Sequence, residues 1–310
     1  MVFQAVYLTF TAFFRSSQMM KETMVISVLM NCLNIAGNYI LINGVGPLPA
    51  LGIAGAAISS GLSRLVGMVI IAVLFWKKFG PVIRFSQLRP FPREQLRRLL
   101  RIGVPAGGES VSYNMSQICI QTVCNRFAAF VVNTRVYANI FANVTYMFGS
   151  AMSQACQVVA ARLMGAEKVE ETNRQVYRTV LCSMVISGAM SVVLFLLCEP
   201  AYRLFTTDPQ VLALARTIML IEIPLELGRA VNMTMCRALQ ACGDIRFPIV
   251  ICVIDAWLVG VGGSWLLGVV FEMGLAGLWI AMAADECIRA CLFLWRWHSR
   301  AWVNKRLLEK

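Results

Sequence analysis

Apolar segments of about 20 residues recur along this chain, and short polar or basic turns separate them. An α-helix needs about 20 apolar residues to cross the hydrocarbon core of a membrane. The pattern therefore predicts an all-α polytopic membrane protein with eight spanning helices. We expect these spans near residues 24–43, 52–76, 103–125, 137–161, 177–198, 211–236, 248–270 and 274–295.

The first apolar segment, residues 1–14, is too short to cross the membrane. It lacks a basic n-region and a small-residue cleavage site, which disfavours a signal peptide. We interpret it as the tail of a further span. An interfacial or re-entrant segment is the alternative.

Two stretches of the chain, 222 positions apart, share an ungapped set of residues. Arg15, Gln18, Gly46, Gly52, Ala54, Gly55 and Ile58 recur as Arg237, Gln240, Gly268, Gly274, Ala276, Gly277 and Ile280. Such duplications are typical of transporter folds, in which the substrate site lies between the repeats. Three spans precede the second copy and almost nothing precedes the first. We therefore expect roughly 120 residues to be missing upstream of Met1 if the two halves are equal.

The duplication predicts two parallel lobes related by an axis along the membrane normal. We assign residues 1–80 to an incomplete first lobe, which holds the tail of one span and two full spans. Residues 81–101 form a basic linker that ends in a short amphipathic helix. Residues 102–297 form a six-helix second lobe, and residues 298–310 form a tail.

The basic residues alternate between the turns, and 21 of the 28 lysines and arginines fall on one side. By the positive-inside rule, the linker and the C-terminus face the cytoplasm, as in a multi-pass protein of the cytoplasmic (inner) membrane. The linker arginines suit contact with anionic lipid, although a solvated, topology-setting loop explains them equally well. No module gathers charge and base-stacking aromatics on one folded face, so we expect no nucleic-acid partner.

Composition narrows the chemistry further. The chain is 58% hydrophobic and 14% charged, with eleven cysteines and one histidine, His298. No C-x-x-C occurs, so the cysteines are expected to be packing residues, without disulfides or a metal site. No nucleophile–base pair is recognisable either, and we predict neither an enzyme nor a cofactor beyond a coupling ion.

One predicted span carries charged residues at membrane depth. Glu222, Glu226 and Arg229 are spaced so that they share a helix face, and Pro224 lies between the two glutamates. Two close carboxylates resist ionising together, which allows one of them to take up and release a proton near neutral pH. A static salt bridge is the alternative, but Arg229 can neutralise only one glutamate. We therefore predict a cation- or proton-binding site here.

Further polar residues extend this candidate site. Glu109, shortly after Pro105, and Asp255, at depth without an obvious local partner, are additional cation- or proton-site candidates. Polar and tyrosine stripes predict a water-filled cavity for polar or cationic substrates, although interhelical hydrogen bonding is the alternative. The candidate cavity residues are Tyr113, Gln117, Gln121, Asn143, Tyr146, Gln154, Arg229 and Asn232.

The last predicted span also carries ionisable residues. Asp285, Glu286 and Arg289 pair at spacings of three and four residues, which favours structural ion pairs that lock helices together. Three asparagines in the first lobe, Asn31, Asn34 and Asn38, are likewise expected to hold helices together.

Several motifs resemble one family, the MATE (multidrug and toxic compound extrusion) transporters, over the whole chain and in the right order. They are Phe14-Arg15-Ser-Ser-Gln18, Gly52-Ile-Ala-Gly55, Gly103-Val-Pro105, Cys236-Arg237-Ala-Leu followed by Gly243-Asp244-Ile-Arg246-Phe-Pro248, and Gly274-Leu-Ala-Gly277-Leu-Trp279. The resemblance implies a V-shaped transporter of two six-helix lobes, here without its first three transmembrane helices. It also implies the export of organic cations in exchange for H⁺ or Na⁺.

The resemblance also suggests roles for individual residues. In sodium-type members a carboxylate lies eleven residues before the signature arginine, and counting back from Arg237 reaches Glu226. These members carry another glutamate in the opening span of the lobe, about one turn beyond the position of Glu109. A lobe without its first helices implies lipid, the missing N-terminal helices or a second chain as partners.

Three functions therefore remain open. The first is a cation-coupled antiporter that exports organic cations or drugs by alternating access. The second is a lipid-linked sugar flippase of the same superfamily, which would favour a cationic cavity, whereas this sequence predicts carboxylates. The third is a truncated, non-transporting remnant or interaction protein.

Overall fold

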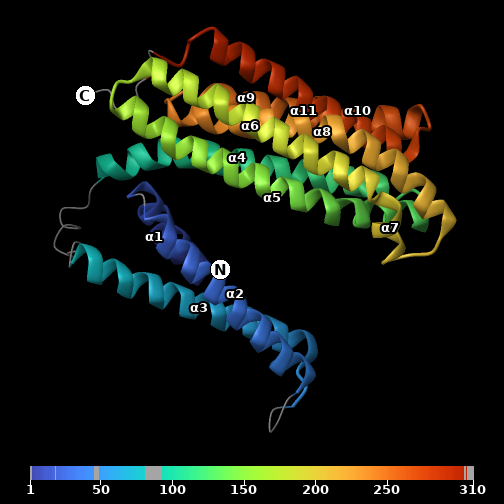
Figure 1. Cartoon of the computed structure of the whole chain (residues 1–310), viewed down its shortest axis with the longest axis horizontal. Coiled ribbons are helices and arrows are strands. Elements are labelled where there is room, and N and C mark those ends of the chain that lie inside the picture. The colour runs from blue at the N-terminus through green and yellow to red at the C-terminus, as the bar shows by residue number, and fades with distance from the viewer. Residues whose placement is uncertain (1, 18, 45–48, 81–92, 304, 306–310) are drawn as a thin grey trace. The chain divides into compact units, whose positions relative to one another are not determined.

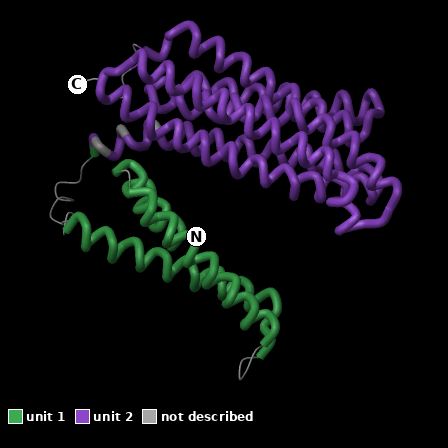
Figure 2. Tube along the Cα trace, viewed as in Figure 1, with its two compact units in different colours: residues 1–93 green, residues 94–310 purple. Residues whose placement is uncertain are grey.

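Long helices make up nearly all of the described part of the chain, which contains no β-strand. The computed structural model describes residues 2–17, 19–44, 49–80, 93–303 and 305. It divides into two compact units, Met1–Arg93 and Glu94–Lys310 (Figures 1 and 2). The predicted all-α fold is confirmed. Linker residues 81–92, tail residues 306–310 and two repeat positions, Gln18 and Gly46, lie outside the described residues.

Aromatic packing holds the first unit together at one end. Its helices are α1 (Val2–Ser16), α2 (Met20–Asn43) and α3 (Gly52–Phe79). Phe10, Phe13 and Phe14 of α1 lie against Phe75 and Phe79 of α3, with ring centroids 5.0–6.4 Å apart. The short apolar segment at the start of the chain is therefore a helix packed on α3.

Polar contacts join α2 to α3 near the middle of both helices. The Asn34 amide donates to Ser60 Oγ at 3.1 Å, and Ser59 Oγ donates to the Asn34 carbonyl at 3.0 Å. In an apolar environment such bonds favour helix association. For Asn34, the predicted role in holding helices together is confirmed.

The second unit is a bundle around α8. Its long helices are α4 (Arg93–Cys124), α5 (Ala129–Gly165), α6 (Val169–Leu196), α8 (Pro209–Ala241) and α11 (Gly274–His298), with a short α7 (Cys198–Arg203). Helix α4 begins at Arg93, so residues 94–101 continue directly into the following span instead of forming a separate short helix. Helix α8 packs against α5, α6 and α11 (Figure 1). Asp208 caps its start by accepting a hydrogen bond from the Gln210 amide at 2.9 Å, and Pro209 occupies the first turn.

The span before α11 departs from regular α-helix. It runs through α9 (Arg246–Asp255), the π-helix η2 (Ala256–Gly262), α10 (Gly263–Trp265) and the π-helix η3 (Leu266–Val270). π-Helical turns are rare and occur frequently at functional sites. The first one begins immediately after Asp255, so it alters the helix where this carboxylate faces its neighbours.

The internal repeat is visible in the backbone. Gly52 and Gly274, 222 positions apart, begin α3 and α11 with φ of +54° and +56°, a conformation that favours glycine. One turn later, a Cβ on Gly55 would lie 2.4 Å from the Leu41 carbonyl oxygen, and one on Gly277 would lie 2.6 Å from the Leu267 carbonyl carbon. Both copies therefore use glycine to bring a helix against the backbone of the preceding one.

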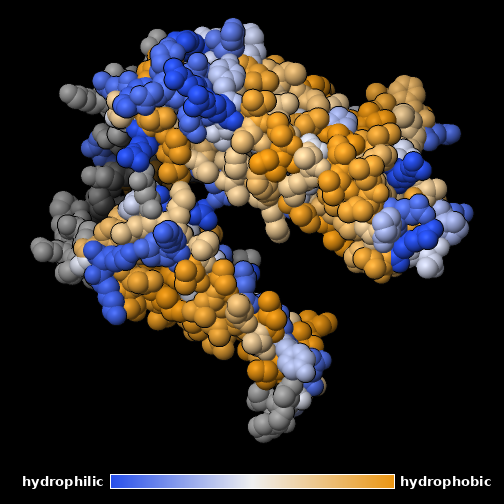
Figure 3. Space-filling view, viewed as in Figure 1, coloured by the Kyte–Doolittle hydropathy of each residue, from blue (hydrophilic) through white to orange (hydrophobic). Residues whose placement is uncertain are grey.

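Hydropathy identifies a membrane protein. Four described helical segments are long and apolar enough to cross a membrane: Met20–Asn43, Gly52–Phe79, Val169–Leu196 and Arg246–Val270. The other four predicted spans, in α4, α5, α8 and α11, are also long helices but carry more polar residues. Figure 3 shows hydrophobic residues across the middle of the visible helices and hydrophilic residues mainly near their ends. Exposed side chains such as Leu181 and Val185, at 64% and 62%, suit contact with lipid. The chain is a multi-pass membrane protein.

The segment after α11 folds back onto the bundle. The Trp302 side chain is fully buried and stacks on Trp297 with ring centroids 4.2 Å apart. Asp244, 1% exposed, accepts hydrogen bonds from Arg296 Nε at 2.8 Å and Lys305 Nζ at 2.6 Å. The described part of the predicted tail is therefore packed.

Replacing Asp244 by asparagine should lower the free energy of unfolding by about 1.5–3 kcal/mol, because two charge-assisted hydrogen bonds to a buried carboxylate are lost. Thermal unfolding of the detergent-solubilised protein would measure this. Glu170→Gln is the matched control: its bond to Arg300, at 2.5 Å, joins two side chains that are 67% and 54% exposed. The control should lose much less, because solvent screens an exposed ion pair. Equal losses would contradict a clamping role for Asp244.

Candidate functional site

Buried charged residues from three helical elements meet inside the second unit. Helix α8 supplies the predicted Glu222, Glu226 and Arg229, α11 supplies Asp285, Glu286 and Arg289, and the end of α9 supplies Asp255. Two arginines organise the group, one on α8 and one on α11.

Arg229 binds carboxylates on both helices. Its guanidinium pairs closely with Glu226 Oε1, lies 3.9 Å from Glu222 Oε1 and lies 3.4 Å from Glu286 Oε1. Asn232 Nδ2 donates to the other oxygen of Glu286 at 2.6 Å. The salt bridge on α8, which was the alternative to the predicted cation site, is thus part of a network that includes α11.

Arg289 is the second centre. It pairs closely with Asp285, one turn before it, and lies 3.4 Å from Glu286 Oε1. Its Nε lies 3.6 Å from Asp255 Oδ2. Asp255 therefore has a charged partner, which its own span did not reveal because the partner lies on α11.

The network holds more negative than positive groups. Its carboxylates, Glu222, Glu226, Asp255, Asp285 and Glu286, are each at most 6% exposed, and two guanidinium groups face them. An ionised carboxylate without a counter-charge is costly at membrane depth. A proton or a bound cation would neutralise part of this surplus.

Three carboxylate oxygens are placed to take up a proton or to bind a cation. Glu222 Oε1, Asp255 Oδ2 and Asp285 Oδ1 are buried, and no N–H or O–H donor among the described residues bonds to them. The other oxygen of Glu222 accepts a hydrogen bond from Trp279 Nε1 at 2.6 Å, so Trp279 orients this side chain. A proton or a small cation would satisfy these oxygens.

A cavity of about 630 Å³ opens beside the network. Its lining includes the predicted Glu109, Tyr113, Gln117, Asn143, Tyr146, Glu222, Arg229 and Asn232, together with Glu286 and Arg289. Gln121 and Gln154 do not contribute to it: Gln121 donates to Asn125 at 2.8 Å, and Gln154 donates to the Ser150 carbonyl at 3.2 Å. Glu226, Asp255 and Asp285 lie behind the lining, in the buried network.

The cavity differs from the expectation in two ways. Arg237 and Arg289 line it in addition to the predicted Arg229, along with Glu109, Glu222 and Glu286, so its positive charge is greater than expected. Glu286 and Arg289, predicted as a structural lock, reach the lining; Glu286 also bridges α11 to α8, and Arg289 bridges α11 to α9. Only the i+3 and i+4 spacing on α11 was visible in the sequence, and it does not indicate which way the helix faces.

Aromatic groups complete the wall. The Arg229 guanidinium carbon lies 6.0 Å from the Tyr146 ring centroid, and Tyr113 and Trp279 also line the cavity. Trp279 has no polar pattern around it in the sequence and was not predicted as a site residue. Rings beside carboxylates form a surface that suits an organic cation.

A bundle of apolar helices with a polar, charge-lined cavity is the arrangement typical of polytopic membrane transporters. A family model described as MatE matches residues 105–266, more than half of the chain. The chain belongs to the MatE family, whose members are transporters and not enzymes.

Curated relatives agree with this assignment. The chain is 33% identical over 302 residues to the "Uncharacterized transporter YisQ" of Bacillus subtilis, covering 97% of this chain and 66% of that protein. It is 26% identical over 306 residues to the "Probable multidrug resistance protein NorM" of Thermotoga maritima, covering 97% of this chain and 65% of that protein. The chain thus spans just under two-thirds of the length of these relatives.

Solved structures share the fold. One described as "Crystal structure of MATE in complex with MaL6" matches with a TM-score of 0.83 at 20% identity, covering 97% of this chain and 67% of that chain. A Pyrococcus furiosus transporter of the MOP superfamily matches with a TM-score of 0.79 at 21% identity, covering 91% of this chain and 63% of that chain. It is described as having a binding pocket of reversed polarity that suggests a different function.

Proposed function

We propose that this chain belongs to a cation-coupled antiporter that exports organic cations, including drugs, by alternating access. One observation carries the proposal: five buried carboxylates face two arginines beside a cavity of about 630 Å³. The negative surplus requires neutralising cations, and the cavity is large enough for a drug-sized molecule. The multidrug resistance name of a relative points to the same activity.

The network provides a physical route to coupling. When H⁺ or Na⁺ neutralises the carboxylates around Arg229, the cavity holds an organic cation less tightly. When that ion leaves, the cavity again binds the organic cation more tightly. If the two facing states differ in their affinity for the coupling ion, a gradient of this ion drives exchange. Glu226 and Glu222 are the central groups, and Asp255 and Glu109 extend the site.

The basic residues also support an orientation of the chain in the membrane. The chain would lie in the cytoplasmic membrane with its C-terminus inside, supported by the 21 of 28 basic residues on one side. Its partners would be small organic cations and membrane lipid, with no cofactor beyond the coupling ion.

The charges that line the cavity distinguish organic cations from the alternative substrate, a lipid-linked sugar. A lipid-linked sugar carries a pyrophosphate and requires unpaired cations. Arg229 and Arg289 are engaged by carboxylates of the network, which leaves Arg237 as the remaining arginine of the lining. Organic cations therefore fit the site better than a lipid pyrophosphate.

Dye efflux from proteoliposomes tests the proposal. Reconstituted chain should move ethidium when an H⁺ or Na⁺ gradient is imposed, and Glu226→Gln should abolish the movement. Glutamine keeps the size of the side chain but can neither ionise nor release a proton. Both proteins would be compared at equal reconstitution, checked by size-exclusion chromatography.

Glu199→Gln is the matched control, because Glu199 pairs with Arg203 at an exposed site on α7. It should transport like the parent chain. Gradient-independent dye movement, or full activity of Glu226→Gln, would contradict the coupling role. A chain that moves no dye under either gradient would favour the non-transporting alternative.

A further inference from the structure

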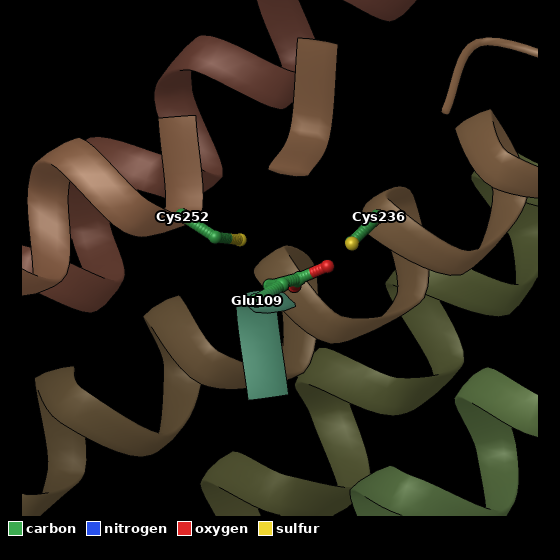
Figure 4. Close-up of side chains that lie close together, drawn as sticks. All are labelled: Glu109, Cys236 and Cys252. Atoms are coloured by element: carbon green, nitrogen blue, oxygen red, sulfur yellow. The ribbon is translucent and has the colours of Figure 1, made fainter. Parts of the chain in front are cut away.

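Three potential metal ligands from three different helices converge on the cavity wall. Glu109 on α4, Cys236 on α8 and Cys252 on α9 each offer one ligand atom, and these atoms all lie within 4.8 Å of one another. Figure 4 shows the three side chains pointing toward a common space. All three residues also line the cavity. We propose that they form a binding site for a thiophilic divalent cation of the Zn²⁺ or Cd²⁺ class.

The donor set selects this class of ion. Cysteine sulfur suits soft and borderline cations, whereas Na⁺, Mg²⁺ and Ca²⁺ prefer oxygen ligands. Two thiolates and one carboxylate resemble the three-ligand sites in which Zn²⁺ keeps its fourth position open. In this chain the open position would face the cavity. The site is therefore distinct in chemistry from the carboxylate network around Arg229 and Arg289.

The spacing is close to what a tetrahedral ion needs. Metal–sulfur bonds of about 2.3 Å and metal–oxygen bonds of about 2.0–2.2 Å place ligand atoms about 3.5–3.8 Å apart. The present separations, none above 4.8 Å, need to contract by at most about 1 Å, which small side-chain rotations can supply because the three residues already face one another. Sequence spacing did not predict this site, since Cys236 and Cys252 come close only through the packing of α8 and α9.

The surroundings support a charged, oriented site. Gln240 lies one turn after Cys236 on α8, and its Nε2 donates a hydrogen bond to Cys236 Sγ at 3.5 Å. Hydrogen bonds of this kind, from residues next to the ligands, orient metal ligands. Two thiolates and a carboxylate around a divalent ion leave one net negative charge. Arg237 and Arg289 line the same cavity and can balance it.

Ion binding would have a mechanical consequence for α4. Many side chains in the first two-thirds of this helix are exposed, including Val104 and Val111 at 63% and 60%. Side-chain bonds reach it from Trp257 Nε1 to Ser112 Oγ at 2.9 Å and from Arg135 to the Ile120 carbonyl at 3.3 Å. An ion held by Glu109 and both cysteines would fasten α4 to α8 and α9.

Cadmium titration of the purified chain tests the site directly. The chain would be kept in detergent with a non-thiol reductant, and the charge-transfer absorption of Cd–thiolate bonds would be followed. We expect one Cd²⁺ per chain with the intensity of two thiolates. Cys236→Ser and Cys252→Ser should each lose half the intensity or more and weaken binding at least about tenfold. Glu109→Gln should weaken binding while the intensity at saturation remains.

The control variant is Cys182→Ser, which removes an exposed cysteine of α6 and should leave the titration unchanged. Size-exclusion profiles of all variants without metal would show whether each remains folded. No charge-transfer band, or an unchanged titration in both cysteine variants at the cluster, would overturn the proposal. The measurement uses neither substrate nor gradient, so it is independent of the proposed transport.

Hydrogen exchange supplies a second readout for Glu109. Amide exchange in residues 104–113 of α4 should slow when Cd²⁺ is added to the parent chain and stay unchanged in Glu109→Gln. Slowing in both proteins, or in neither, would overturn the assignment of Glu109 as a ligand.

Discussion

Replacing Arg289 by glutamine is expected to lower the free energy of unfolding by about 3–5 kcal/mol at neutral pH. Arg289 is 4% exposed, and its guanidinium contacts Asp285, Asp255 and Glu286. Its removal leaves buried carboxylates without their counter-charge, which costs more than the lost contacts alone. Thermal unfolding of the detergent-solubilised chain, followed by tryptophan fluorescence, would measure the loss.

Arg203→Gln is the control for this change. Arg203 pairs with Glu199 at 2.6 Å, but the two side chains are 63% and 66% exposed, so the expected loss is below about 1 kcal/mol. The loss in free energy of unfolding caused by Arg289→Gln should become smaller as the pH falls, because protonated carboxyl groups no longer need a counter-charge. A loss in free energy of unfolding that grows as the pH falls would contradict the conclusion that unpaired carboxylates cause it.

Replacing Gly277 by alanine is expected to cost about 1–3 kcal/mol, from overpacking against backbone that cannot move aside. The new Cβ would lie 2.6 Å from the Leu267 carbonyl carbon, 2.7 Å from its oxygen and 2.8 Å from the Gly268 nitrogen. Relief requires α11 to separate from the preceding span. The same unfolding measurement would detect the change.

Gly149→Ala is the matched control, because a Cβ there would meet nothing within 4 Å. It should stabilise α5 slightly, by up to about 1 kcal/mol, since alanine favours helix over glycine. Gly55→Ala should behave like Gly277→Ala, because its Cβ would meet the Leu41 carbonyl at 2.4 Å. Similar effects at Gly149 and Gly277 would show that helix propensity, and not close approach, governs these sites.

The helices were predictable because their signal is local. An apolar run of about 20 residues bounded by polar turns indicates a span whatever packs around it. Each of the eight predicted spans overlaps a long helical segment of the structure. Spans 103–125 and 177–198 run one and two residues past the ends of their helices, and other ends are shifted by up to about ten residues where polar sequence continues the helix. The repeat was visible for a similar reason, since Gly52 and Gly274 serve the same backbone turn.

The candidate site was only partly predictable. Glu222, Glu226 and Arg229 lie on one face of one helix, so their spacing revealed them. Contacts between helices had no such signal. Asp255 meets Arg289 through the packing of α9 on α11, and a π-helical turn follows it directly.

The sequence by itself determined the class of fold, the positions of the helices and the segment of α8 that carries buried charge, because each depends on residues near one another along the chain. Only the tertiary structure decided which charges share a network, which of them face the cavity, and that Glu109 meets Cys236 and Cys252. Those contacts depend on how each helix is rotated about its axis and at what depth it packs. Helical periodicity shows which residues share a face, but not what that face meets.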